Sequence, residues 1–301
     1  MIVLPSAKYF SSVPSVAEIA RFTTPKSSGT FGALNTAYVY TTTGYVAVKW
    51  WDGVTTVYGN GIPISIQYIT KLVAAPYNTS AEKEFSMYAC DSTGKIIGHI
   101  TTIGFGNYTR SQINFVDIYS LSQLGIFACD SGSGLTSYKH NGRIGTLALT
   151  NTGLTSLDLS NGFRLIELNL AYSTVLASIT GVSSLRNILN FDCRITSVTS
   201  LEFSAANNPY LYNINVSNCA SLTSLRAVGC ILYSDYYSTY SLFKGGASLQ
   251  SCGLGTAAIE QFFTDLGNGD GYINITCASG VPVNDSIATN KGYTVIGNTP
   301  C

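Results

Sequence analysis

The chain has 301 residues, with 16 basic and 16 acidic side chains and therefore no formal net charge at neutral pH. Only 11% of the residues are charged, less than half of the usual fraction of about a quarter, whereas the 46% apolar content is ordinary. Nucleic-acid binding depends on basic side chains that neutralise phosphates, so this composition argues against it. A neutral surface of Ser, Thr, Asn and Tyr suits a protein that packs against neighbours in an assembly or is displayed outside a cell.

Residues 1–13 hold the apolar stretch at the N-terminus, and Pro5 and Lys8 interrupt it. This stretch is too short for the core of a signal peptide, and no stretch of about 20 apolar residues follows. The initiating Met1 argues against a leader that has been removed. We therefore expect neither ordinary export nor a membrane-spanning segment.

Residues 1–115 are expected to form a β-domain. A short helix is predicted over residues 15–22, with Ser15 as its N-cap and Glu18 as the capping-box partner. Alternating apolar and polar residues predict strands over residues 45–51, 54–58, 64–72, 84–91, 95–103 and 111–118. Asp52 and Gly53 form a hairpin signal between the first two strands. Short strands with frequent turns are typical of a β-sandwich or a small barrel.

Trp50 and Trp51 are neighbours on one predicted strand, so their side chains face opposite sides of it. One of them is expected to anchor the core. The other is expected at the surface, where a large aromatic side chain is a candidate platform for a carbohydrate or a protein partner.

The middle of the chain repeats a phrase about ten times between Leu121 and Leu254: apolar, two residues, apolar, one residue, apolar, two residues, small polar. The phrase fits the leucine-rich pattern in which Asn or Cys holds the ninth place. Its copies start at positions 121, 135, 144, 154, 165, 176, 185, 198, 211 and 222. Two phrases give one coil of about 22 residues, so the sequence predicts a solenoid of about five coils.

Within each phrase the fourth and sixth residues are two positions apart, so both side chains should point into the same core. A small polar residue in the ninth place can bond the backbone of a tight bend. Some copies depart from the pattern. The copy from Leu176 has Gly181 in the sixth place, and the copy from Leu135 has His140 and Arg143 in the sixth and ninth places.

The run GLTSLDLSNGFRLIELNLAYST, residues 153–174, resembles the repeats of about 21 residues found in leucine-rich-repeat proteins of the bacterial surface and in some tailed-phage virion proteins. Residues 254–295 are similar to the segment that caps such repeats. Together with the N-terminal strands, this resemblance implies a mainly β protein. Its expected parts are an N-terminal β-sandwich or small barrel (1–115, the anchor), a leucine-rich-repeat solenoid (116–256) and a C-terminal α/β cap (257–301).

Four of the eight cysteines fall in the ninth place of a phrase and are predicted to form a buried ladder of reduced thiols: Cys129, Cys193, Cys219 and Cys230. Cys252 fits the fourth place of a phrase that starts at Leu249. Cys277 and Cys301 flank the predicted cap, where they either pair in an oxidising medium or stay free. No Cys or His spacing typical of a zinc site is present in the sequence.

The best candidates for an outward contact lie in the insertion between Cys230 and Leu249, which is longer than a single phrase. Repeat proteins often carry binding residues in insertions, and tyrosines offer wide contact area at a low entropic cost. The candidate binding residues are Tyr233, Asp235, Tyr236, Tyr237 and Tyr240, together with Trp50 and Trp51. The alternative is that the tyrosines only cover the last hydrophobic turn.

Catalytic and metal-binding patterns are mostly missing from the sequence. His99 and His140 have no neighbouring Cys, Ser or carboxylate motif, and we interpret both as incidental polar residues. Asp265 and Asp270 lie in a Gly-rich turn, but Thr276 stands where a calcium loop needs its last ligand, Glu. No carboxylate pair for glycoside hydrolysis is singled out. The sequence therefore predicts no enzyme activity, no metal and no cofactor.

These features favour a non-enzymatic structural protein of a tailed-phage virion, as a capsid decoration or a tail or neck component. Such a protein is assembled in the host cytoplasm, where thiols stay reduced, and needs no export signal because lysis releases it. Its N-terminal domain is expected to contact other virion proteins in a multimeric assembly, and its solenoid to present a surface for a host protein or a glycan, with no nucleic-acid binding or membrane insertion. Two alternatives stay open: a bacterial cell-surface or secreted adhesin, and a cytoplasmic protein-binding scaffold.

Overall fold

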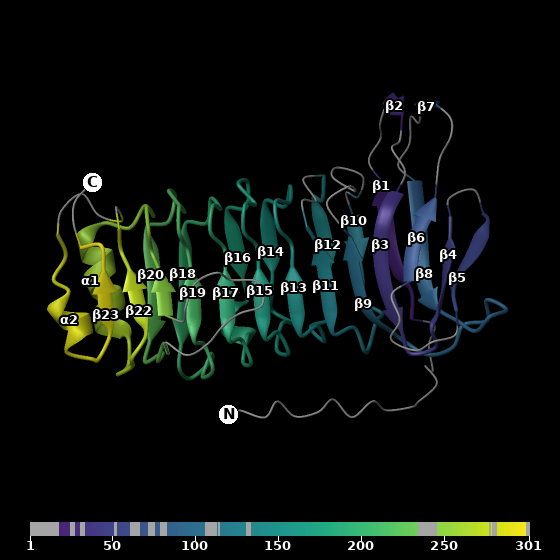
Figure 1. Ribbon diagram of the computed structural model, residues 1–301. Coiled ribbons are helices and arrows are strands. Elements are labelled where there is room, and N and C mark those ends of the chain that lie inside the picture. Colours follow the sequence, from purple (N-terminus) through teal and green to yellow (C-terminus); the bar gives the residue numbers. More distant parts are fainter. Residues whose placement is uncertain are drawn as a thin grey trace.

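A computed structural model of the chain describes residues 18–24, 28–30, 34–50, 53–60, 67–71, 76–78, 83–105, 113, 115–130, 134–233, 246–276, 278 and 282–298. In these residues a mixed N-terminal sheet is followed by a β-solenoid of about seven turns with repeats of about 23 residues (Figure 1). The chain is mainly β and contains little helix. The expectation of about five coils is too low, because further coils follow the last copies of the phrase toward the C-terminus.

The described N-terminal part contains β1 (Ala20–Thr24), β2 (Ser28–Thr30), β3 (Leu34–Thr41), β4 (Tyr45–Lys49), β5 (Thr55–Gly59), β6 (Gln67–Lys71), β7 (Pro76–Asn78), β8 (Lys83–Ala89), β9 (Ile100–Phe105) and β10 (Phe115–Asp117). β1, β4, β5, β8 and β10 belong to one sheet, and β3, β6 and β9 to another. Phe22 of β1 joins the two sheets, because its ring centre lies 5.1 Å from that of Phe85 on β8 and 5.2 Å from that of Phe105 on β9.

The predicted hairpin between residues 45–51 and 54–58 is confirmed. β4 and β5 pair antiparallel from Tyr45 opposite Gly59 to Lys49 opposite Thr55. Gly53 closes the turn with a φ of 81°, a value that favours glycine because L side chains rarely adopt it. Asp52, the other residue of the hairpin signal, lies outside the described residues.

The helix predicted over residues 15–22 is wrong in its described part. The chain enters β1 at Ala20, and β1 pairs antiparallel with both β8 and β10. Ala20 and Phe22 are buried whereas Arg21 between them is exposed, which is the period of a strand with one face on the core. Pairing on both edges outweighs the weak local helix signal. Ser15, the expected N-cap, lies outside the described residues.

The solenoid carries strands on two faces of its coils (Figure 1). The first face continues from β9 as a row of parallel strands: β11 (Ile126–Cys129), β13 (Thr146–Ala148), β15 (Glu167–Asn169), β17 (Asn190–Asp192), β19 (Asn213–Asn215), β21 (Gly246–Ser248), β22 (Tyr272–Asn274) and β23 (Thr294–Ile296). The second face has shorter ladders: β10 with β12 (Ser137–Lys139), β14 (Ser156–Asp158) with β16 (Ser178–Thr180), and β18 (Ser200–Ser204) with β20 (Ser224–Val228).

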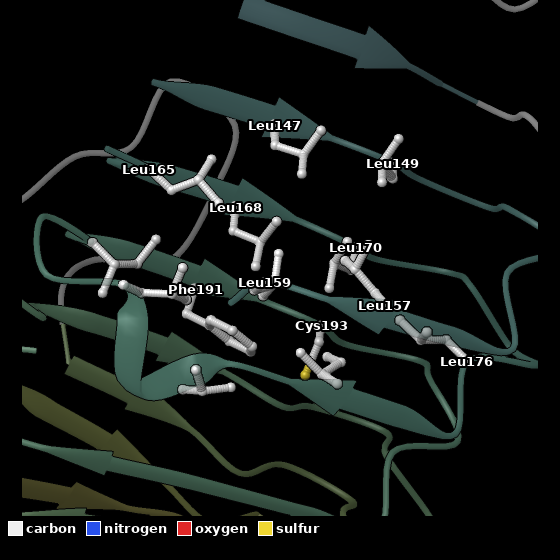
Figure 2. Close-up of a cluster of buried hydrophobic side chains, with 14 of the residues drawn as sticks. Leu147, Leu149, Leu157, Leu159, Leu165, Leu168, Leu170, Leu176, Phe191 and Cys193 are labelled. Carbon is white, nitrogen blue, oxygen red and sulfur yellow. The ribbon is translucent and has the colours of Figure 1, made fainter. Parts of the chain in front are cut away.

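The fourth residues of the first-face phrases stack along the solenoid core, as the sequence predicts. Leu147 pairs with Leu168, Leu168 with Phe191, and Phe191 with Ile214. Figure 2 shows the first three in one row, with the sixth-place residues beside them. None of the four is more than 1% exposed. Burial of one such side chain contributes about 1.5–3 kcal/mol relative to exposure, so this stack is a main source of stability.

Two first-face copies start three residues later than the sequence suggests, at 124 and 188 and not at 121 and 185. The strand pairing puts Phe127 and Phe191 in the fourth place. Cys129 and Cys193 therefore hold the sixth place and not the ninth. The phrase itself causes this error, because it begins with two apolar residues that are three positions apart and fit the pattern in either register.

The ninth-place residues form a column of small side chains at the bend after each first-face strand. Ser173 donates from Oγ to the carbonyl oxygen of Leu149 at 3.1 Å and accepts from the amide of Thr152 at 3.1 Å. In a later coil, Thr196 donates from Oγ1 to the carbonyl oxygen of Cys193 at 2.8 Å. These bonds satisfy backbone groups at the bend, which is the role that the sequence predicts for this place.

The residue before this column adopts left-handed backbone angles in five coils: Asn151 (φ 51°), Tyr172 (φ 65°), Ile195 (φ 56°), Asn218 (φ 59°) and Ser251 (φ 51°). Each amide donates to a carbonyl oxygen of the next coil, as Ile195 does to Ser217 at 2.9 Å. The ladder between coils thus continues around the bend. Asn tolerates these angles better than a bulky or β-branched residue does.

Replacing Ile195 by Asn is expected to stabilise the chain by about 1 kcal/mol, because left-handed angles cost ordinary residues about 1–2 kcal/mol. The loss of partial burial of the isoleucine offsets some of the gain. Urea unfolding followed by circular dichroism measures the difference. Val228→Asn, at an exposed site without left-handed angles, is the control and should not stabilise. A lower urea midpoint for Ile195→Asn than for the unchanged chain would contradict this assignment of strain.

The first described coil of the solenoid packs directly on the N-terminal strands. β11 pairs in parallel with β9, and β12 pairs in parallel with β10. The ring centres of Phe127 and Phe105 are 6.2 Å apart across this junction. Both sheets therefore continue from the N-terminal strands into the solenoid, and the N-terminal strands cover the apolar end of the solenoid.

The C-terminal segment extends the solenoid and has the α/β character that the sequence predicts. β22 and β23 continue the parallel sheet. α1 (Thr256–Asp265) packs against β20 and α2 (Ser286–Thr289), and α2 packs against β23. Arg226 of β20 holds α1 in place by donating from Nη2 to Oδ1 of Asp265 at 2.9 Å and from Nε to Oδ2. Lys291 donates from Nζ to three carbonyl oxygens at the end of α1, those of Phe263, Thr264 and Leu266.

Candidate functional site

A surface pocket of about 490 Å³ lies where four successive first-face strands end. Its lining includes residues that end or follow β11, β13, β15 and β17: Asp130, Thr150, Asn151, Asn169, Tyr172 and Arg194. We call it the corner pocket. Because each coil supplies one part of the wall, the spacing of the coils fixes the spacing of the side chains.

Backbone hydrogen bonds hold the corner pocket in shape. The amide of Asn151 donates to the carbonyl oxygen of Ala171 at 2.8 Å, and the amide of Tyr172 donates to that of Arg194 at 3.0 Å. Oδ1 of Asn169 accepts from the amide of Ala171 at 3.1 Å. These bonds satisfy the turning backbone, so the side chains project from a rigid corner and not from a long loop.

Tyr172 and Arg194 form one wall of the corner pocket. The guanidinium carbon of Arg194 lies 5.6 Å from the ring centre of Tyr172, within the range of a cation–π contact. Nε of Arg194 lies 3.6 Å from Oδ2 of Asp192, a carboxylate whose side chain is 7% exposed. Burial raises the pKa of Asp192, and the charge of Arg194 opposes that rise. The tyrosine ring thus stands next to a guanidinium that a buried carboxylate orients.

Asp130 lies on the opposite wall, at the end of β11. Its Oδ1 accepts a hydrogen bond from Oγ1 of Thr150 at 3.0 Å. The pocket therefore holds a carboxylate and a guanidinium, and their charges cancel. It offers hydrogen-bond donors and acceptors around an aromatic ring, which is an arrangement for binding a polar, uncharged ligand.

Two of the candidate binding residues from the sequence are described, and neither lines this pocket. Trp50 is 2% exposed, stacks on Phe85 with ring centres 5.7 Å apart and donates from Nε1 to Oγ1 of Thr56 at 3.2 Å. It is a core residue. Tyr233 is 40% exposed and contacts Tyr212 edge to face, with ring centres 5.0 Å apart. The remaining candidates lie outside the described residues: Trp51, Asp235, Tyr236, Tyr237 and Tyr240.

The four ladder cysteines are buried and free, but they do not form one column. Cys129 and Cys193 hold the sixth place of first-face phrases, Cys219 the ninth place of that face and Cys230 the ninth place of the second face. Cys252 is also free and buried; it holds a ninth place and not the expected fourth, because β21 places Ala247 and not Cys252 at the strand centre. Cys277 and Cys301 lie outside the described residues.

Cys219 differs from the other ladder thiols in its electrostatic surroundings. Burial raises the pKa of Cys129 and of Cys230 to about 12. The pKa of Cys219 is instead lowered, because side-chain hydrogen bonding with Cys193 and, to a smaller extent, with Thr196 favours its thiolate. Access still limits its reactivity, because Cys219 is fully buried.

We expect all four ladder cysteines to remain reduced and to react slowly with iodoacetamide until denaturant opens the solenoid, since a buried thiol must be exposed before it is attacked. Mass spectrometry of the chain after labelling at increasing urea concentrations checks this. Labelling of each thiol should follow the unfolding transition measured by circular dichroism. A disulfide between any two of them, or complete labelling without urea, would contradict the expectation.

Glu18 ties the N-terminal strands to the solenoid and does not cap a helix. Its carboxylate accepts from the hydroxyl of Ser122 and lies 3.1 Å from Nδ1 of His99, which is 81 positions away in the sequence. Both Glu18 and His99 are buried. Ser122 bonds to the carboxylate and not to the imidazole, so the three groups lack the hydroxyl–imidazole–carboxylate order that activates a serine. We interpret them as a structural clamp.

His140 is a core residue in the sixth place of its phrase, as the sequence places it. Its ring stacks on Tyr138 with centres 5.5 Å apart. Nδ1 accepts from the amide of Gly142 at 3.0 Å, and Nε2 lies 3.3 Å from the carbonyl oxygen of Asp158. A neutral ring with its proton on Nε2 satisfies both contacts. Burial lowers the pKa of His140, against the effect of its hydrogen bond to Asp158.

Sequence reasoning missed the corner pocket, although the phrase holds a signal for it. The eighth place of the first-face phrases has the left-handed angles, and Asn fills it in two coils. Tyr172 stands in the same place, where a bulky side chain is unfavourable. Such a departure from a local rule often marks a functional position.

No group of three or more His, Cys, Asp or Glu side chains that could hold a metal ion occurs in the described part of the chain. None of the helices found there has the length and apolar character needed to cross a membrane. Comparisons with known proteins found no family model, no curated protein and no solved structure that matches the chain.

Proposed function

We propose that the chain is a non-enzymatic structural protein of a tailed-phage virion, displayed as a capsid decoration or as a surface component of the tail or neck. The observation that carries this proposal is the continuity of the two sheets from the N-terminal strands into the solenoid. A chain built in this way is stiff, so an anchor at its N-terminal end holds the other coils away from the particle.

In this proposal the N-terminal part contacts other virion proteins in a multimeric assembly, and the solenoid presents the surface that meets a host protein or a glycan. The free, buried thiols support assembly in the host cytoplasm, where disulfides are rare. The low charge of the chain supports close packing against neighbours, because few charged groups have to be desolvated at a contact.

We also propose that the coils are of the leucine-rich-repeat type. The spacing of the inward residues supports this assignment, because the fourth-place and sixth-place residues of the phrase stack in the core of both faces. The coil differs from the common pattern in carrying the phrase twice, and the second copy forms short strands where helices are often found.

Fractionation of an infected culture tests the proposal. After gradient purification of the particles, quantitative mass spectrometry measures the chain in particles, cell envelope and cytoplasm. The proposal expects a constant ratio of this chain to the major capsid protein across the particle peak. Enrichment in the cell envelope would favour an adhesin, and recovery in the soluble cytoplasm alone would favour a protein-binding scaffold; either result would overturn the proposal.

A further inference from the structure

We propose that the corner pocket binds a saccharide, with a sugar ring stacked on Tyr172 and its hydroxyl groups bonded to Asp130, Asn169 and Arg194. The inference rests on the proposed function in one respect, since it supplies a ligand class for the displayed surface. It also names the site, which lies on the first face of the solenoid and extends from the end of β11, the strand next to β9, to the end of β17.

Tyr172 provides the platform for the sugar ring. Its side chain is 49% exposed although it contacts Arg194. The backbone holds it at a φ of 65°, and a strained conformation of this kind persists only where the surroundings fix it. The face of an aromatic ring carries partial negative charge, whereas the C–H groups on one face of a pyranose carry partial positive charge. A tyrosine that is exposed and held in place is therefore a better platform for a sugar ring than a flexible tyrosine.

The polar groups around Tyr172 match the hydroxyl groups of a sugar. The carboxylate of Asp130 is an acceptor only, and one of its oxygens already accepts from Thr150. Asn169 uses its Oδ1 to accept from the backbone, so its NH₂ group is the half that can donate outward. Arg194 contributes only donors. A hydroxyl group both donates and accepts, so it can bond to either kind of side chain.

Charge and size argue against the other ligand classes. An isolated phosphate would be repelled by the negative charge of Asp130, and a cationic ligand would be repelled by the positive charge of Arg194. The volume of about 490 Å³ is within the range of about 300–1,000 Å³ for small-molecule pockets, which is room for about one or two sugar rings. A peptide would gain little from walls that are polar apart from Ala171 and the ring of Tyr172, because they offer few apolar anchors.

Saturation-transfer NMR on the full chain tests the inference directly. The probes are the methyl glycosides of glucose, galactose, mannose, rhamnose and N-acetylglucosamine, with a Gly-Ser-Gly peptide as another ligand class. Inorganic phosphate has no C–H protons, so its binding is measured by calorimetric titration. At least one glycoside should show saturation transfer, with the strongest signals on the C–H groups of one face of its ring. Calorimetric titration with that glycoside then gives the dissociation constant.

Tyr172→Asn removes the ring and introduces the residue that two other coils have in the equivalent left-handed position, so the fold should persist. It should weaken binding about tenfold or more, which corresponds to about 1.4 kcal/mol. Tyr172→Phe keeps the stacking face and should stay within about threefold of the unchanged chain. Tyr210→Asn removes another exposed tyrosine outside the pocket and should leave binding unchanged.

Three results would overturn the inference: no saturation transfer from any glycoside, binding of phosphate or the peptide alone, or equal affinity for the Tyr172→Asn and unchanged chains. These results are separate from the test of the proposed function. A chain that binds a glycoside through Tyr172 but is missing from purified particles refutes the virion role and leaves the pocket assignment standing. A chain that is found in particles but binds no glycoside refutes the pocket assignment and leaves the virion role standing.

Discussion

Replacing Leu168 by Asp is expected to unfold the solenoid. Leu168 is 1% exposed and pairs with Leu147 in one neighbouring coil and with Phe191 in the other. The substitution removes about 1.5–3 kcal/mol of apolar burial and places a carboxylate where no cation can reach it. The cost exceeds about 4 kcal/mol, which is a large part of the stability of a typical domain. Thermal unfolding followed by circular dichroism should show the loss of the cooperative transition.

The control for Leu168→Asp places the same residue at an exposed position. Val175 is 49% exposed, and Val175→Asp should unfold within a few degrees of the unchanged chain. Leu168→Met, which conserves volume, should cost less than about 1.5 kcal/mol. An unaltered melting curve for Leu168→Asp would show that the fourth place of the phrase does not point into the core and that the register of the coils is incorrect.

Deleting residues 1–115 is expected to make the remaining solenoid aggregate. The deletion removes β9, so the first solenoid strand, β11, loses its partner along the sheet and presents an unpaired edge. It also removes Phe105 and uncovers Phe127, which is fully buried in the complete chain. Repeat proteins need their end coils covered to stay soluble. Size-exclusion chromatography and binding of a hydrophobic dye to residues 116–301 measure this effect.

The deleted chain should elute as large aggregates, or bind the dye strongly at a low melting temperature, whereas the full chain should do neither. A monodisperse fragment with the melting temperature of the full chain would show that the solenoid closes its own N-terminal end. In that case residues 1–115 could not be assigned as the cover of the first coil, and their role as anchor would rest on the particle experiments alone.

The sequence is most informative where one chemical rule repeats. The copies that start at 144, 165 and 211 predict the inward residues of the first face, because apolar side chains two positions apart must share one side of a strand. The same rule leaves a shift of three residues open. Only the pairing of Phe127 and Phe191 with their neighbours resolves it, since pairing between coils is a contact that no local pattern contains.

Long-range contacts also explain what the sequence does not predict. A capping-box pattern at Glu18 suggests a helix, but in the structure this carboxylate is buried beside His99 of a distant segment. Likewise Tyr172 and Asp130 look like ordinary exposed residues until the coils stack and bring them to one pocket. Gly181 breaks the apolar pattern for a similar reason, since a Cβ there would lie 2.2 Å from the backbone nitrogen of Ser160.

Images of purified particles labelled with an antibody fragment against the solenoid test the proposed function most directly. The fragment should be raised against the coils around Tyr172, and electron cryomicroscopy should locate it. The proposed function predicts regularly spaced label on the particle surface, with the N-terminal strands nearest the particle and the labelled coils facing outward. Particles without label would contradict the proposed function. Images in which the labelled coils lie nearest the particle and the N-terminal strands face outward would contradict the assignment of anchor and display surface.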